Sequence, residues 1–108
     1  MAPLTPEDRP PIACDMGAFT GEERARYHAL RERLMAQVVV TEATPSGVRW
    51  RLDKAVDLPE IVEWMALERR CCPLLRLELQ LPPDGSAWVE AGGGAGVKDF
   101  LATEFRRV

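Results

Sequence analysis

VVVTEATPSGVRWRL, residues 38–52, decides the fold because it contains two strand-like runs on either side of a turn. Residues 38–41 form a β-branched run, and residues 48–52 alternate apolar with polar side chains. Between them, Thr44-Pro45-Ser46-Gly47 is typical of a turn. The stretch therefore predicts a β-hairpin, whose two strands are antiparallel.

A helix is expected before this hairpin. Thr20 is followed three residues later by Glu23, which is the pattern of a capping box at a helix start. Apolar residues then recur at helical spacing, namely Tyr27, Leu30, Leu34 and Val38. This pattern predicts a helix from about residue 21 to the mid-30s.

A second helix is expected after the hairpin. Asp57 is a suitable N-cap, and Pro59 falls in the first turn, where proline is tolerated. The apolar stripe that follows consists of Leu58, Ile61, Val62 and Met65. Pro73 disfavours the α conformation in the residue before it, so this helix should end near Cys71 or Cys72.

The rest of the chain predicts a second hairpin and a closing helix. Residues 75–81 alternate leucine with polar residues, and a turn at 82–85 leads to a further strand at 87–91. After the glycine-rich residues 92–96, a helix is indicated by Val97, Phe100, Leu101, Phe105 and Val108. The order α-β-β-α-β-β-α predicts an α+β two-layer sandwich, with an antiparallel sheet of two hairpins and the helices on one face.

Length and composition predict one domain. A chain of 108 residues supports a single core, which we expect over residues 14–108. Residues 1–13 contain four prolines and predict an extended or disordered arm. The net charge is -3 and no long basic run occurs, so binding to nucleic acid is not expected. The absence of a signal-peptide pattern or a long apolar run favours a cytoplasmic protein without membrane contact.

The three cysteines predict a thiol site. Three is an odd number, and a disulfide between neighbours such as Cys71 and Cys72 would be strained. Soft metal or metalloid ions select sulfur ligands, and Cys14 is the remaining thiol that could complete a three-coordinate site. A structural zinc site is not indicated, because it needs four ligands, usually in paired motifs. We therefore hypothesise that Cys14, Cys71 and Cys72 are ligands of a soft ion.

Three further residues are expected to support these thiols. Glu68 precedes Cys72 by four residues and shares its helix face, whereas Cys71 would project about 100° away on a regular helix. Asp15 directly follows Cys14, and Arg76 is a cation that favours thiolate. Two other residues are interpreted as surface residues, namely His28 and Arg70.

Two motifs carry a resemblance to a known family. They are Cys14-Asp15 with the helix opening up to Thr20, and ERRCCPLLRLEL at residues 68–79; Gly96 to Leu101 fits as well. In these the chain resembles a family of small, largely uncharacterised bacterial proteins. The chain departs at Leu74 and Leu77, where relatives tend to have phenylalanine. Related domains occur fused to regulators of the mercury-sensing class, which implies ligands that are soft metals or thiol-reactive compounds.

Three functions remain open from the sequence. The favoured hypothesis is a module that binds Hg(II) or As(III) through the three cysteines. The second is a thiol-dependent enzyme, either a redox protein or one of organomercurial type in which Asp15 or Glu68 handles a proton. The third is a structural domain that forms a homodimer through its sheet or helix face, with the cysteines as core residues.

Overall fold

The computed structural model describes residues 15–105 and confirms the predicted order of elements. The arm at 1–13, Cys14 and Val108 lie outside the described residues. The elements are η1 (Met16–Ala18, a 3-10 helix), α1 (Gly21–Ala36), β1 (Val38–Thr44), β2 (Gly47–Leu52), α2 (Leu58–Cys71), β3 (Arg76–Gln80), β4 (Ala87–Gly92) and α3 (Val97–Glu104).

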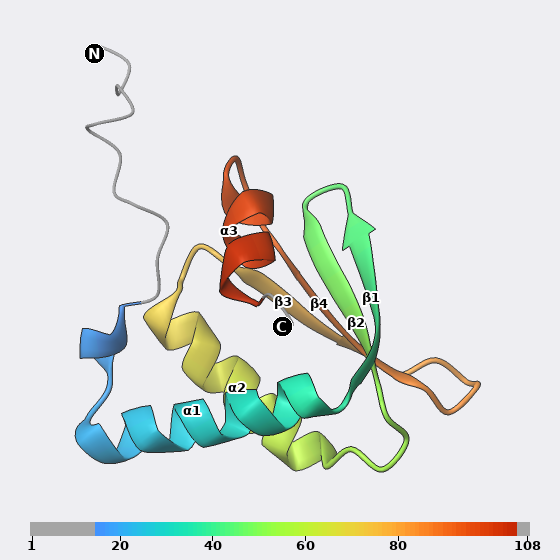
Figure 1. The fold of residues 1–108 in the computed structure, drawn as a ribbon, viewed down its shortest axis with the longest axis horizontal. Coiled ribbons are helices and arrows are strands. Elements are labelled where there is room, and N and C mark those ends of the chain that lie inside the picture. Colours follow the sequence, from blue (N-terminus) through green and yellow to red (C-terminus); the bar gives the residue numbers. More distant parts are fainter. Residues whose placement is uncertain (1–14, 106–108) are drawn as a thin grey trace.

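The four strands form one antiparallel sheet in the order β1-β2-β4-β3 (Figure 1). The two hairpins are joined through β2 and β4, where Trp50 lies opposite Val89. On its other side, Val89 lies opposite Leu79 of β3. This order leaves β1 and β3 as the edge strands.

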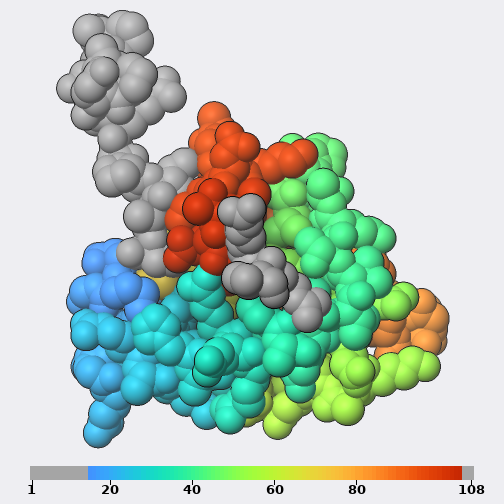
Figure 2. Space-filling model, viewed as in Figure 1, coloured from blue at the N-terminus to red at the C-terminus, as the bar shows by residue number. Residues whose placement is uncertain are grey.

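The helices pack on one face of the sheet, as predicted. Side chains alternate along each strand, so Trp50, Leu52, Val89 and Ala91 point to the helix side, where all four are buried. Helices α2 and α3 contact this face, and α1 packs mainly on α2. In Figure 2, α1 forms an outer layer of the molecule with α3 above it. The open face of the sheet includes Arg49, whose guanidinium lies 3.8 Å from the centre of the Trp88 ring.

The helix starts follow the local signals in the sequence. The capping box of α1 is complete, because the Glu23 amide donates to the Thr20 hydroxyl over 3.1 Å and the Thr20 amide donates to the Glu23 carboxylate over 3.0 Å. The Asp57 carboxylate accepts from the Glu60 amide over 3.2 Å. Each cap contributes about 1 kcal/mol to stability.

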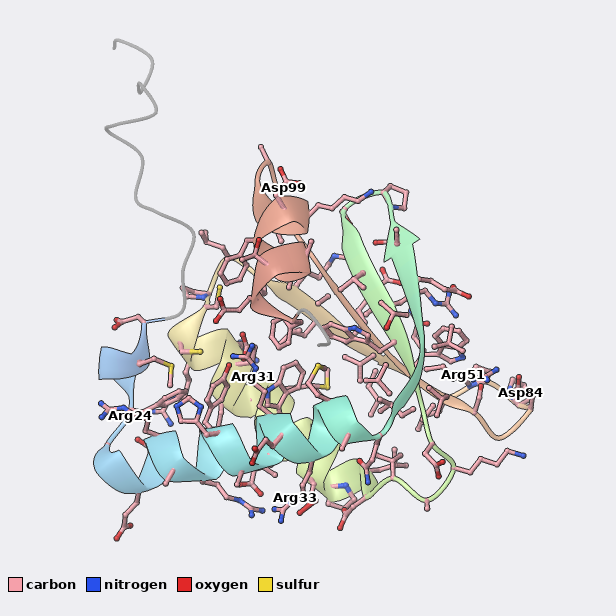
Figure 3. All side chains as sticks on the ribbon, viewed as in Figure 1. Arg24, Arg31, Arg33, Arg51, Asp84 and Asp99 are labelled. Atoms are coloured by element: carbon pink, nitrogen blue, oxygen red, sulfur yellow. The ribbon has the colours of Figure 1, made fainter. Side chains whose placement is uncertain are left out.

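Arg31 ties α1 to the end of α3. Its side chain reaches from α1 toward α3 (Figure 3), donates to the carbonyl of Glu104 and lies 4.5 Å from the centre of the Phe105 ring. Phe105 in turn contacts the buried rings of Trp50 and Trp64, at centroid distances of 5.3 and 6.0 Å. The three helices and the sheet therefore share one core. None of the helices within residues 15–105 is long and apolar enough to cross a membrane.

Candidate thiol site at the end of helix α2

Both cysteines at the end of α2 are buried thiols. The exposed fraction of the side chain is 0% for Cys71 and 1% for Cys72. Helix α2 ends at Cys71, and Cys72 has φ -134° and ψ 77°, outside the helical region. This break precedes Pro73, whose ring disfavours the α conformation at Cys72. Adjacent side chains on a regular helix point about 100° apart, so burial of both is not expected there. The change in backbone direction at Cys72 allows both cysteine side chains to be buried.

Glu68 is a buried carboxyl group on the same helix. Among residues 15–105 it is the one charged side chain in the buried core, with 0% of its surface exposed. The hydroxyl of Tyr27, on α1, donates a hydrogen bond to its Oε2 atom. The backbone carbonyl of Glu68 accepts from the Cys72 amide over 2.8 Å and from the Cys71 thiol over 3.5 Å. Glu68 therefore contacts α1 through its side chain and the cysteines through its backbone.

Asp15, the first described residue, is joined to the end of α2 by a backbone hydrogen bond. Its backbone N–H donates to the carbonyl of Cys71 over 2.7 Å. Its carboxylate accepts from the amide of Gly17 over 3.0 Å and caps η1. The backbone of Asp15 is thus fixed at the end of α2, while its side chain is used locally. Cys14, the preceding residue in the sequence, lies outside the described residues.

Residues 15–105 contain no group of three or more His, Cys, Asp or Glu side chains that could hold a metal ion. Cys14 lies outside these residues. No family model, curated protein or solved structure matches this chain. What the site can bind therefore follows from the chemistry of its own residues.

Arg70 is more than a solvated surface residue. Its guanidinium binds both carboxylate oxygens of Glu23, at 2.5 and 3.2 Å, and donates to the carbonyl of Ala18 over 3.1 Å. It also lies 5.4 Å from the centre of the Phe19 ring. The hydrogen bond from Arg70 is the main cause that lowers the pKa of Glu23 to about 2. Arg70 thus fastens η1 and the start of α1 to α2, beside the cysteines.

Arg76 lies on the open face of the sheet, whereas Glu68 is buried on the helix side. It alternates with Leu75 and Leu77, which lie on the helix side, so its side chain belongs to the open face of the sheet. There it pairs with Glu78 at 2.9 Å and Glu90 at 3.5 Å, and donates to the Ser46 hydroxyl over 3.1 Å. From the sequence, Arg76 was expected to support the thiols. Strand alternation puts its side chain on the sheet face opposite the helices, where these ion pairs form. His28 is exposed, as interpreted from the sequence.

Proposed function

We propose that this protein binds one soft metal or metalloid ion, such as Hg(II) or As(III), through the thiolates of Cys14, Cys71 and Cys72. The observation that carries the proposal is the 2.7 Å hydrogen bond from the Asp15 amide to the Cys71 carbonyl. Cys14 is covalently joined to that same amide nitrogen, and consecutive Cα atoms are about 3.8 Å apart. This hydrogen bond at the neighbouring residue therefore supports the choice of Cys14 as the third ligand in the proposal.

The residue types suit a soft ion. Thiolates are the ligands that such ions select, and adjacent cysteines supply two of them with little chain entropy left to lose. Binding would require the Cys71 thiol to lose the proton that it now donates to the Glu68 carbonyl. The affinity should therefore rise with pH until the thiols are deprotonated. The role of Glu68 in this proposal is to position the end of α2, because its carboxyl is held by Tyr27.

The test is an anaerobic titration of the reduced full-length protein with Hg(II) and with As(III). Absorption of the thiolate-to-metal bond and the count of remaining thiols would be followed for the native chain and for Cys14→Ser, Cys71→Ser and Cys72→Ser. We expect one ion per chain, three thiols consumed, and weaker binding in each variant. A control is Met35→Leu, which leaves every thiol in place. Unchanged affinity in Cys71→Ser or Cys72→Ser would overturn the proposal.

A second candidate is a thiol-dependent enzyme, and the buried pair of Tyr27 and Glu68 beside the cysteines favours it. In an organomercurial reaction, the carbon–mercury bond would break as a proton from the Glu68 carboxyl adds to the carbon atom. Mercury would stay on the thiolates, and Glu68 would be left as a carboxylate. Release of hydrocarbon from an alkylmercury compound would be measured in the native chain and in Glu68→Gln. Turnover that Glu68→Gln abolishes, with Hg(II) binding retained, would support this enzyme. Binding without any turnover would leave only the first proposal.

A further inference from the structure

Helix α2 and the edge strand β3 form a groove of about 530 Å³ on the helix side of the sheet. The lining is mostly apolar and consists of Val62, Met65, Ala66, Arg69, Pro73, Leu75, Leu77 and Leu79. These α2 residues lie on a different face of the helix from the buried Ile61, Trp64, Glu68 and Cys71. The groove therefore opens on a different side of α2 from Glu68 and Cys71, and Pro73, which directly follows Cys72, lies at its end.

Exposed apolar side chains occur on α2 and at both ends of β3, the two elements that form this groove. Val62 lines it and is 53% exposed, and Leu74 and Leu81, just before and just after β3, are 55% and 57% exposed. Within residues 15–105, the one other large apolar side chain with comparable exposure is Val39, on the opposite edge strand. A concentration of exposed apolar residues on one side of a small protein marks an interaction surface.

The outer edge of β3 is paired with no described strand. Such an edge presents backbone N–H and C=O groups in the arrangement that accepts another strand. Native proteins protect edges by bulges, prolines or inward-pointing charges, but the inward residues Leu77 and Leu79 of β3 are apolar. The backbone and the groove above it therefore suit the same occupant, which must supply both a strand and an apolar surface.

The charged side chains of β3 indicate which strand can pair with its outer edge. If two copies of β3 pair antiparallel about Leu77, Arg76 of each copy lies opposite Glu78 of the other. Leu75 then lies opposite Leu79 on the helix side, so both faces match. Arg76 and Glu78 form a 2.9 Å ion pair within one chain, and in this arrangement each would exchange that partner for its counterpart in the other copy. Opposite charges at facing positions stabilise strand pairing, whereas like charges oppose it.

We propose that a second copy of this chain pairs with β3 edge to edge, so that the two sheets become continuous and the groove is covered by the α2 helix of the partner. The two-fold axis would be perpendicular to the sheet at Leu77, which brings both α2 helices to the same face. Val62 and Leu81 of each copy would then be buried in the interface. This inference rests on β3 and α2 and does not depend on the proposed ion site.

The experiment measures molecular mass in solution by sedimentation over a range of concentrations, with four forms of the full chain. We expect the native chain to be a dimer. Arg76→Glu and Glu78→Arg should each weaken dimerisation about tenfold or more, because each places like charges opposite one another twice. An equimolar mixture of the two variants should dimerise again, because every facing pair is then opposite in charge. The double variant Arg76→Glu/Glu78→Arg should dimerise by itself.

A second pair of variants tests the apolar part of the surface. Val62→Glu should weaken the dimer, whereas Val39→Glu, on the opposite edge, should leave it intact. Circular dichroism would establish that each variant is folded. A native chain that stays monomeric would overturn the proposal, and so would a dimer that resists the single charge reversals. Failure of the mixture to restore the dimer would overturn the register about Leu77.

Discussion

The hydroxyl of Tyr27 on α1 donates a hydrogen bond to the Glu68 carboxyl on α2, and both side chains are fully buried. A buried carboxyl oxygen that loses its donor retains its desolvation penalty. We therefore expect Tyr27→Phe to lower the free energy of unfolding by about 1–3 kcal/mol. Urea denaturation of the reduced protein would measure this change. The control is Glu32→Ala at an exposed position of α1, which should have little effect. Equal stability of the two variants would contradict the prediction.

The ion pair between Glu23 and Arg70 should make stability depend on pH. Hydrogen bonding to Arg70 lowers the pKa of Glu23 from 4.5 to about 2 in the folded chain. A lowered folded pKa means that the pair's contribution is complete above about pH 4.5 and is lost as the pH falls toward 2. The variant Arg70→Met should flatten the decline in stability over this interval, as measured by urea denaturation at several pH values. The matched control is Arg69→Met, which removes a neighbouring exposed cation. If the slope of stability against pH is unchanged in Arg70→Met, the ion pair with Glu23 is not the cause of the decline.

Gly47 lets strands β2 and β4 approach each other. A Cβ atom at this position would lie 2.0 Å from the carbonyl oxygen of Ala91 and 2.8 Å from the Cα atom of Gly92. Because backbone atoms cannot move aside cheaply, Gly47→Ala should destabilise the protein by at least about 2 kcal/mol. Gly21→Ala is the comparison, since a Cβ there meets nothing within 4 Å at the start of α1. Thermal denaturation should show a large loss of stability for Gly47→Ala only. A small loss of stability in Gly47→Ala would mean that strands β2 and β4 can move apart to admit the methyl group.

The sequence predicted the elements well because their signals are local. The signals act over a few residues: Thr20 with Glu23 marks a helix start, Asp57 marks another, and Pro73 marks a helix end. In the structure, α1 begins directly after Thr20, α2 begins directly after Asp57, and α2 ends at Cys71. The pairing of β2 with β4 was not predicted, since it depends on how distant hairpins dock. The bond from Arg70 to Glu23 spans 47 residues and was missed for the same reason, although Glu23 was recognised as a capping residue.

The candidate site was predicted less completely than the fold. Sequence spacing brought Glu68, Cys71 and Cys72 to one helix end, and the structure has these three residues there. The partner of Glu68 was not foreseen, because Tyr27 was interpreted only as part of the apolar stripe of α1. A signal was present in the sequence: a tyrosine in a buried stripe needs a partner for its hydroxyl, and a glutamate at a core position supplies one. The support of the thiols by Arg76 stays a prediction, and its ion pairs in the structure are with Glu78 and Glu90 on the open face of the sheet.

The burial of Cys71 and Cys72 predicts slow reaction with a bulky thiol reagent. Both are at most 1% exposed, so reaction requires the end of α2 to open. In a Cys14→Ser background, which leaves these two thiols, we expect the native fold to react far more slowly than the urea-unfolded chain. Arg70→Met should accelerate the reaction several-fold, because Arg70 holds η1 and α1 against α2 through Ala18 and Glu23. The rate of release of a coloured thiolate from an aromatic disulfide would measure both effects.

Arg69→Met provides the matched control for this reaction. Arg69 neighbours Arg70 but lines the groove beside β3, so its removal should leave the rate unchanged. Loss of a positive charge by itself disfavours the thiolate and slows the reaction, so equal acceleration by both variants would contradict the specific role of Arg70 in holding η1. Immediate reaction of both thiols in the native fold would show that the end of α2 opens faster than its burial implies. A slow native rate that rises only in Arg70→Met would identify η1 as the element that restricts access of reagents to Cys71 and Cys72.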